Sequence, residues 1–71
     1  MNVDRLVAMA NDIANFFAAE PDQQVAVEGV FAHLTRFWTP RMREQLAAHA
    51  DDARLSNLAR TAAARLPLKK A

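Results

Sequence analysis

Residues 33–43 read His33-Leu34-Thr35-Arg36-Phe37-Trp38-Thr39-Pro40-Arg41-Met42-Arg43, and they decide the fold of this chain. Thr39 and Pro40 together predict the start of a helix, because threonine is a favoured N-cap and proline suits the first helical position. The apolar residues before them recur at helical spacing, so one helix ends where the next begins. Residues 33–43 therefore predict a sharp corner between two helices.

The corner also carries three arginines. Arg41 and Arg43 fall in the first turn of the predicted helix, where the helix dipole favours acidic side chains over basic ones. Arg41 can form an ion pair with Glu44 at i, i+3, whereas Arg36 and Arg43 have no acid three or four positions away. This arrangement indicates a site for an anion or for an acidic partner.

Apolar residues recur at helical spacing in four segments, which predicts helices over residues 3–19, 23–38, 39–50 and 53–66. Asp22 is expected to cap the second helix, and Asp51-Asp52 offers a cap for the fourth. Pro67 ends the fourth helix, so residues 67–71 are expected to form a flexible tail. No pattern predicts a β-strand. The short connections predict an all-α fold, a single domain over residues 1–71 built as a small antiparallel bundle of three to four helices.

Helical projection also predicts which side chains face the core. Asn11 falls on the polar face of the first helix. Phe37 is expected in the core, whereas Trp38 is either a core residue or an interface anchor at the rim, since tryptophan is common in binding hot spots. The other side chains expected to face the core are Leu6, Met9, Ile13, Phe16, Phe17, Val27, Val30, Phe31, Leu34, Met42, Leu46, Leu55, Leu58, Ala59, Ala62 and Leu66.

A short strip of the second helix faces away from the apolar stripe: Gly29, His33 and Arg36 lie close together on the projection. A glycine inside a helix costs about 1 kcal/mol relative to alanine. Gly29 is therefore either of no consequence or a place where a partner's backbone comes close. With the corner, this strip supplies the candidate partner-binding residues, which are Gly29, His33, Arg36, Trp38, Arg41 and Arg43.

No pattern predicts catalysis, and no residue is expected to be catalytic, to ligate a metal or to bind a cofactor. The chain has no cysteine, which removes thiolate metal sites, disulfides and cysteine nucleophiles. His33 and His49 lack the spacing of a metal-binding pair. Gly29 is the only glycine, so no glycine-rich phosphate loop exists. A hydrolytic set can be assembled from Ser56, His49 and Asp52, but almost any chain supplies these residue types.

Charge and hydropathy argue against two classes of partner, nucleic acids and membranes. The formal net charge is +1 with eight acidic residues, which argues against nucleic acid. No apolar run approaches the ~20 residues of a transmembrane helix, and residues 1–5 do not resemble the start of a secretory signal. The absence of cysteine is compatible with a reducing compartment such as the cytosol but does not establish one. A core this small is marginal, so burial of another apolar face against a partner or a second copy would stabilise it.

The corner is similar to a known family signature. The residues that carry the resemblance are His33-Leu34, Arg36-Phe37-Trp38 and Pro40-Arg41-Met42-Arg43, together with Leu6-Val7, Met9-Ala10-Asn11, Ile13-Ala14 and Phe16-Phe17. On these residues the chain resembles the delta subunit of NAD-dependent, molybdenum-containing formate dehydrogenases. The resemblance covers residues 3–50 well, and the fourth predicted helix matches in general character only.

This resemblance implies a small, non-catalytic accessory subunit of a cytoplasmic complex. The other subunits would carry a molybdenum bis-pterin guanine dinucleotide cofactor, iron–sulfur clusters and FMN, and this chain would bind none of them. The implied partner is the large catalytic subunit, and the implied role is assembly, stability, or insertion or retention of the molybdenum cofactor. Two alternatives stay open: a small nucleic-acid-binding module whose arginines contact phosphates, and a self-associating helical bundle.

Overall fold

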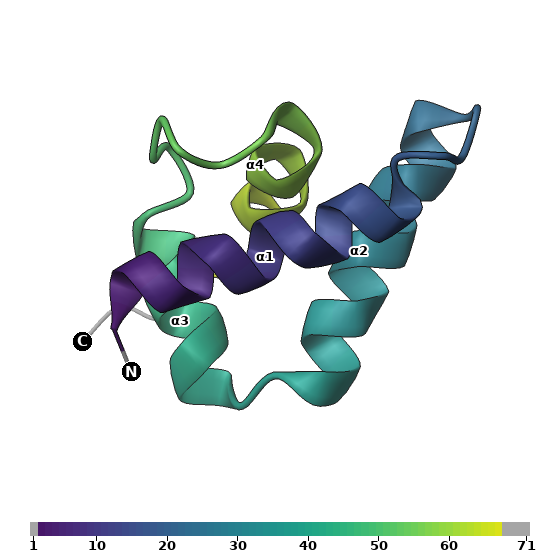
Figure 1. Ribbon diagram of the computed structural model, residues 1–71. Helices are drawn as coiled ribbons and strands as arrows, with labels where there is room; N and C mark the ends of the chain where they lie inside the picture. Colours follow the sequence, from purple (N-terminus) through teal and green to yellow (C-terminus); the bar gives the residue numbers. More distant parts are fainter. Residues whose placement is uncertain (1, 68–71) are drawn as a thin grey trace.

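The structure is a computed structural model that describes residues 2–67. It contains four α-helices, namely α1 (Val3–Phe17), α2 (Gln23–Phe37), α3 (Pro40–Ala48) and α4 (Asn57–Ala64) (Figure 1). No β-strand occurs within residues 2–67, so the predicted all-α class is confirmed. Apart from Pro67, the predicted tail lies outside the described residues. None of the helices in the described part of the chain has the length and apolar character needed to cross a membrane.

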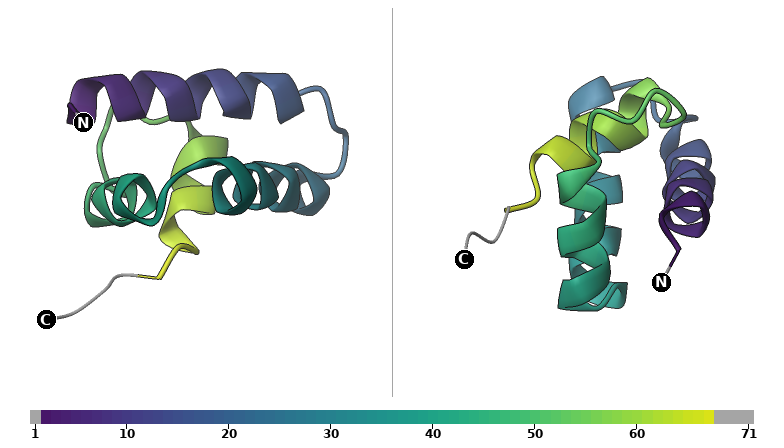
Figure 2. Two further views of the ribbon diagram at one scale, coloured as in Figure 1. Left: turned by 90° about the horizontal axis from the view of Figure 1, so that it is seen from below. Right: turned by 90° about the vertical axis from the view of Figure 1, so that its left-hand side faces the viewer.

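The four helices surround one core in two layers (Figure 2). α2 and α3 run in opposite directions and are joined by the short corner at their ends (Figure 1). α1 crosses over this pair, and α4 packs mainly against α2 while also contacting α1. The predicted helical bundle is therefore confirmed, with α1 lying across the other helices.

Each helix begins after a residue whose side chain accepts a hydrogen bond from a free backbone N–H of the first turn. Asp22 accepts from the backbone N–H of Gln24 at 2.9 Å. Thr39 Oγ1 accepts from the backbone N–H of Met42 at 3.2 Å, and Pro40 occupies the first helical position. These contacts confirm the predicted starts of α2 and α3.

The predicted start of the fourth helix is wrong. Ser56 caps α4, with its Oγ accepting from the backbone N–H of Ala59 at 3.2 Å. Asp52 instead closes a turn, because its carboxylate accepts from the guanidinium of Arg54 at 2.9 Å and from the backbone N–H of Arg54 at 2.8 Å. These bonds stabilise the ionised carboxylate and lower the pKa of Asp52 to about 2.

Asn11, on the polar face of α1, holds the loop between α3 and α4. Its Nδ2 donates to the carbonyl of Arg54 at 2.9 Å, and its Oδ1 accepts from the backbone N–H of Ser56 at 2.9 Å. Arg54 also forms an ion pair with Asp4 of α1. The polar face of α1 therefore fixes the position from which α4 starts.

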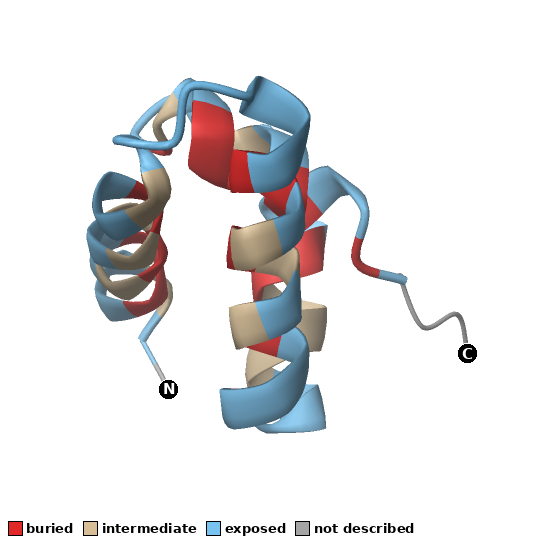
Figure 3. Ribbon diagram, turned by 90° about the vertical axis from the view of Figure 1, so that its right-hand side faces the viewer, coloured by how far each residue is buried: buried red, intermediate tan, exposed pale blue. Residues whose placement is uncertain are grey.

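The core lies where the inner faces of the helices meet (Figure 3). Its largest fully buried side chains are Leu6, Val30, Leu34 and Leu46, all of which were predicted to face it. Buried alanines of α1, α2 and α4 surround these larger side chains. Small side chains let the helices approach closely, so a few leucines are enough to fill the space between them.

Five aromatic side chains were predicted to lie in the core or at its rim. Phe17 and Phe31 are partly buried and pack against the core, and the exposure of the other three decides their place. Phe16 and Phe37 are 79% and 71% exposed, so their predicted burial is wrong. Trp38 is only 6% exposed, so it is a core residue and not an anchor at the rim. α2 ends at Phe37, and Trp38 has extended backbone angles (φ −88°, ψ 146°). Helical projection therefore no longer applies at Trp38, and its side chain turns inward while Phe37 stays outside.

Candidate functional site

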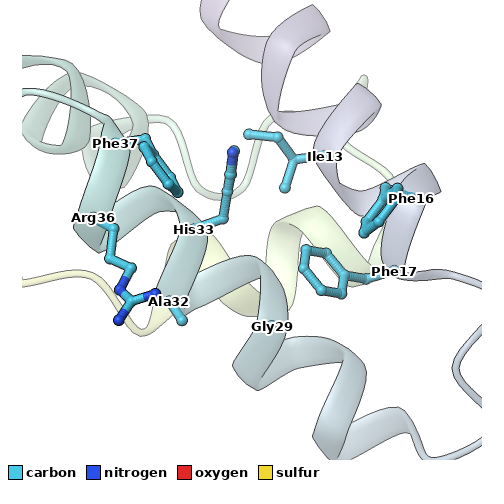
Figure 4. A pocket seen from close by; sticks show the side chains of 8 residues that line it. All are labelled: Ile13, Phe16, Phe17, Gly29, Ala32, His33, Arg36 and Phe37. Carbon is cyan, nitrogen blue, oxygen red and sulfur yellow. The ribbon is translucent and has the colours of Figure 1, made fainter.

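A groove opens between the second halves of α1 and α2 (Figure 4). Its volume is about 530 Å³, which lies within the range of roughly 300–1,000 Å³ typical of ligand-binding pockets. Most of its lining is apolar, with two basic side chains among it. The lining residues are Ile13, Phe16 and Phe17 of α1 and Gly29, Ala32, His33, Arg36 and Phe37 of α2.

Gly29 allows the ring of Phe17 to lie directly against α2 (Figure 4). A Cβ atom at position 29 would lie 2.5 Å from both Cδ1 and Cε1 of Phe17, which is closer than side-chain carbons approach. The close approach expected at Gly29 therefore comes from this chain's own Phe17, and no partner backbone is needed to explain the glycine. The pair of Gly29 and Phe17 forms the floor of the groove.

Two exposed aromatic rings form the lips of the groove. The ring of Phe16 stands edge-on to that of Phe17, with 5.1 Å between centroids and 88° between planes. The ring of Phe37 lies 4.8 Å from the imidazole of His33. Because most of each lip faces water, the groove and its lips form one exposed apolar patch, a feature that marks interaction sites on soluble proteins.

The polar part of the groove is basic. His33 is half-buried, and among residues 2–67 its Nδ1 atom, which is itself buried, has no hydrogen-bond partner. Arg36 is exposed and takes part in none of the ion pairs formed within the described chain. No acidic residue lines the groove. An acidic group on a ligand or partner would therefore meet the exposed guanidinium of Arg36 with no competing acid in the lining.

Arg43 has no acid three or four positions away, but its guanidinium is bound within the chain. Its Nη1 atom donates to the carbonyl of Thr35 at 3.2 Å and to the carbonyl of Trp38, at the C-terminal end of α2. The last carbonyls of a helix carry partial negative charge and lack partners within the helix. An arginine that opposes the dipole of α3 thus complements the dipole of α2 across the corner.

The structure does not gather the three arginines into one site. Arg36 lines the groove, whereas Arg43 lies with Glu44 beside a separate cavity of about 240 Å³. Arg41 is exposed, and its expected ion pair with Glu44 is not among the ion pairs of the described residues. Within residues 2–67 no group of three or more His, Cys, Asp or Glu side chains could hold a metal ion. A role for Arg41 in partner binding stays a prediction.

Of the six candidate partner-binding residues, the structure places three in the groove, namely Gly29, His33 and Arg36. The other three do not line it. Sequence reasoning missed the contribution of α1, because it assigned both Phe16 and Phe17 to the core. The available signal was their adjacency: neighbours in a helix point about 100° apart, so two large adjacent rings do not both face one core.

The contact between Gly29 and Phe17 predicts a non-additive pair of substitutions. Gly29→Ala in a helix interior normally stabilises by about 1 kcal/mol. Here the added methyl group collides with the Phe17 ring, so we expect little or no gain in the free energy of unfolding. In a Phe17→Ala background the ring is gone, and the same substitution should recover the full gain. Urea unfolding of the wild type, the two single variants and the double variant measures the coupling between the two positions. Equal effects of Gly29→Ala in both backgrounds would show that the methyl group does not collide with the Phe17 ring.

The comparison with protein families places most of the chain in a known family model. Residues 5–63 match the family model described as NADH-dependent formate dehydrogenase delta subunit FdsD. The match spans most of the chain and confirms the resemblance noted at the corner and along the first helix. No curated protein and no solved structure matches the chain.

Proposed function

The chain belongs to this family of NADH-dependent formate dehydrogenase delta subunits, and from that membership we propose that it is a non-catalytic accessory subunit. Its partner is the large catalytic subunit, and its role is to assist assembly, stability, or insertion or retention of the molybdenum cofactor. The molybdenum bis-pterin guanine dinucleotide, the iron–sulfur clusters and FMN belong to the partner subunits in this proposal. In this proposal the complex lies in the cytoplasm and reduces NAD with electrons from formate.

The structural observation that supports a binding role is the groove between α1 and α2. Two aromatic rings stay in water at its lips, although burying each would be worth about 1.5–3 kcal/mol. A small domain that leaves such side chains exposed around a concave surface is suited to association. The absence of cysteine also means that no thiolate of this chain can ligate an iron–sulfur cluster. These features favour a binding role over a redox role.

No observation favours the nucleic-acid alternative. Binding to a phosphate backbone needs several cations on one surface. In this structure Arg43 is bound to carbonyls of α2, and Arg36 lines an apolar groove. The corner is therefore not a cluster of cations available to phosphates.

The proposed function is tested by expressing the catalytic subunits with and without this chain. We expect the complex made without it to hold less molybdenum per large subunit or to lose subunits during gel filtration. Supplying the chain during expression should restore both. In a matched control, the Trp38→Ala variant is supplied in place of the wild-type chain. Because this variant lacks a buried core side chain, the complex should resemble the one made without the chain. Equal molybdenum content, equal subunit composition and equal formate-dependent NADH formation with and without the chain would refute the proposal.

A further inference from the structure

We infer that the groove between α1 and α2 is the docking surface for an amphipathic helix of a catalytic partner subunit, one that presents apolar side chains next to a carboxylate. This inference rests on the proposed accessory function and adds the surface and the chemistry of its occupant. It is carried by the shape, exposure and charge of the groove lining.

The exposed lips favour a macromolecular occupant over a small ligand. A small apolar molecule would sit on the floor formed by Gly29 and Phe17. It would leave the rings of Phe16 and Phe37 largely in water, where they are 79% and 71% exposed. A protein segment covers floor and lips together, and burial of both rings contributes to its affinity.

The groove walls favour a helical segment. Both walls are helices, so their backbone N–H and C=O groups are already paired within α1 and α2. Residues 2–67 contain no strand edge that could pair with an extended segment. A segment that enters an apolar groove must therefore satisfy its own backbone hydrogen bonds. A helix does so, and it presents apolar side chains at i, i+3, i+4 and i+7.

The charge of the groove favours a carboxylate on that helix and disfavours a second copy of this chain. Arg36 and His33 lie in the lining without an acidic neighbour among the lining residues. A carboxylate from the partner would pair with Arg36 beside the apolar contact. A two-fold dimer through this groove would instead bring the same patch to both sides of the interface. The lining holds no acidic residue, so neither copy would offer a carboxylate to Arg36 of the other.

The first experiment measures binding of variants of the full chain to the complex expressed without it. Arg36→Glu and Phe37→Ala should each weaken binding about tenfold or more, since charge reversal and loss of an exposed aromatic anchor act at the groove. Arg41→Glu tests the competing prediction that the partner binds at the α2–α3 corner, and Val25→Ala is the control for loss of an exposed apolar side chain. Both residues are exposed and lie outside the groove lining, and we expect binding as in the wild type. Thermal melts of the four variants should be close to that of the wild type.

The outcomes separate the inference from the proposed function. If the wild-type chain does not bind the complex, the accessory function itself fails. If it binds and Arg36→Glu and Phe37→Ala bind equally well, the function stands and the groove is not the docking surface. If Arg41→Glu weakens binding as much as Arg36→Glu, the contact lies at the α2–α3 corner, and the inference is overturned.

A second experiment identifies the occupant directly. Photoreactive p-benzoylphenylalanine at position 37 of the full chain should crosslink, within the assembled complex, to one peptide of a catalytic subunit. We expect that peptide to be an amphipathic helical segment with at least one aspartate or glutamate. The same group at position 25 is the control and should not label that peptide. Crosslinks to a second copy of this chain, to a peptide without an acid, or to no subunit would refute the inference.

Discussion

Replacing Trp38 by alanine is expected to lower the free energy of unfolding by about 3–5 kcal/mol, the usual cost of removing a buried aromatic side chain. Trp38 is 6% exposed and belongs to the core cluster with Leu34 and Leu46. A domain of 71 residues has roughly 4–10 kcal/mol of stability in total. The substitution therefore removes between about a third and all of that stability. We expect a thermal transition in circular dichroism that is strongly lowered or absent.

The adjacent aromatic residue is the matched control for this prediction. Phe37 is 71% exposed, so Phe37→Ala should change the free energy of unfolding by less than about 1 kcal/mol. Trp38 is also the only tryptophan, and its fluorescence in the wild type should shift to longer wavelength on unfolding. Equal destabilisation by the two substitutions, or an emission maximum unchanged on unfolding, would show that Trp38 is not in the core.

The second large effect is expected at the corner. Arg43→Met keeps most of the aliphatic stem and removes the guanidinium that donates to the carbonyls of Thr35 and Trp38. Hydrogen bonds from a charged donor contribute about 1.5–3 kcal/mol, and arginine and methionine have similar helix propensity. We therefore expect a loss of about 1–2 kcal/mol, since solvent can replace part of these bonds.

Arg41→Met provides the comparison, because it removes a positive charge from the same turn of α3. Arg41 is exposed and is not held by the carbonyls of α2. Both variants remove a positive charge near the start of α3, so any resulting increase in the free energy of unfolding is common to them. The difference between their urea midpoints therefore measures the contact across the corner. Identical stability of Arg41→Met and Arg43→Met would show that this contact contributes nothing.

Features that depend on neighbours in sequence could be predicted. The caps at Asp22 and Thr39 were predicted, because an N-cap bonds to N–H groups two or three residues away. The start of the fourth helix could not be predicted in the same way. Asp52 is engaged by Arg54, and Arg54 is in turn held by Asp4 from α1. These contacts depend on the position of α1, which no local pattern reports.

Only the α2 side of the candidate site could be predicted from the sequence. Helical projection placed Gly29, His33 and Arg36 on one strip of α2, and they do share one surface. The facing wall comes from Phe16 and Phe17, and it exists only because α1 crosses α2 at that level. A crossing depends on the packing of the whole domain, so projections of single helices do not contain it.

The contacts of Asn11 have a consequence for the order of events during synthesis. They join α1 to the loop before α4 across 43 and 45 positions of the chain. A chain emerging from the ribosome has therefore completed α1, α2 and α3 before it supplies the two backbone groups that bind Asn11. Since α1 provides one wall of the groove, the finished groove appears only after residue 56 has left the exit tunnel. A partner subunit would then meet the finished surface only once the loop before α4 has emerged.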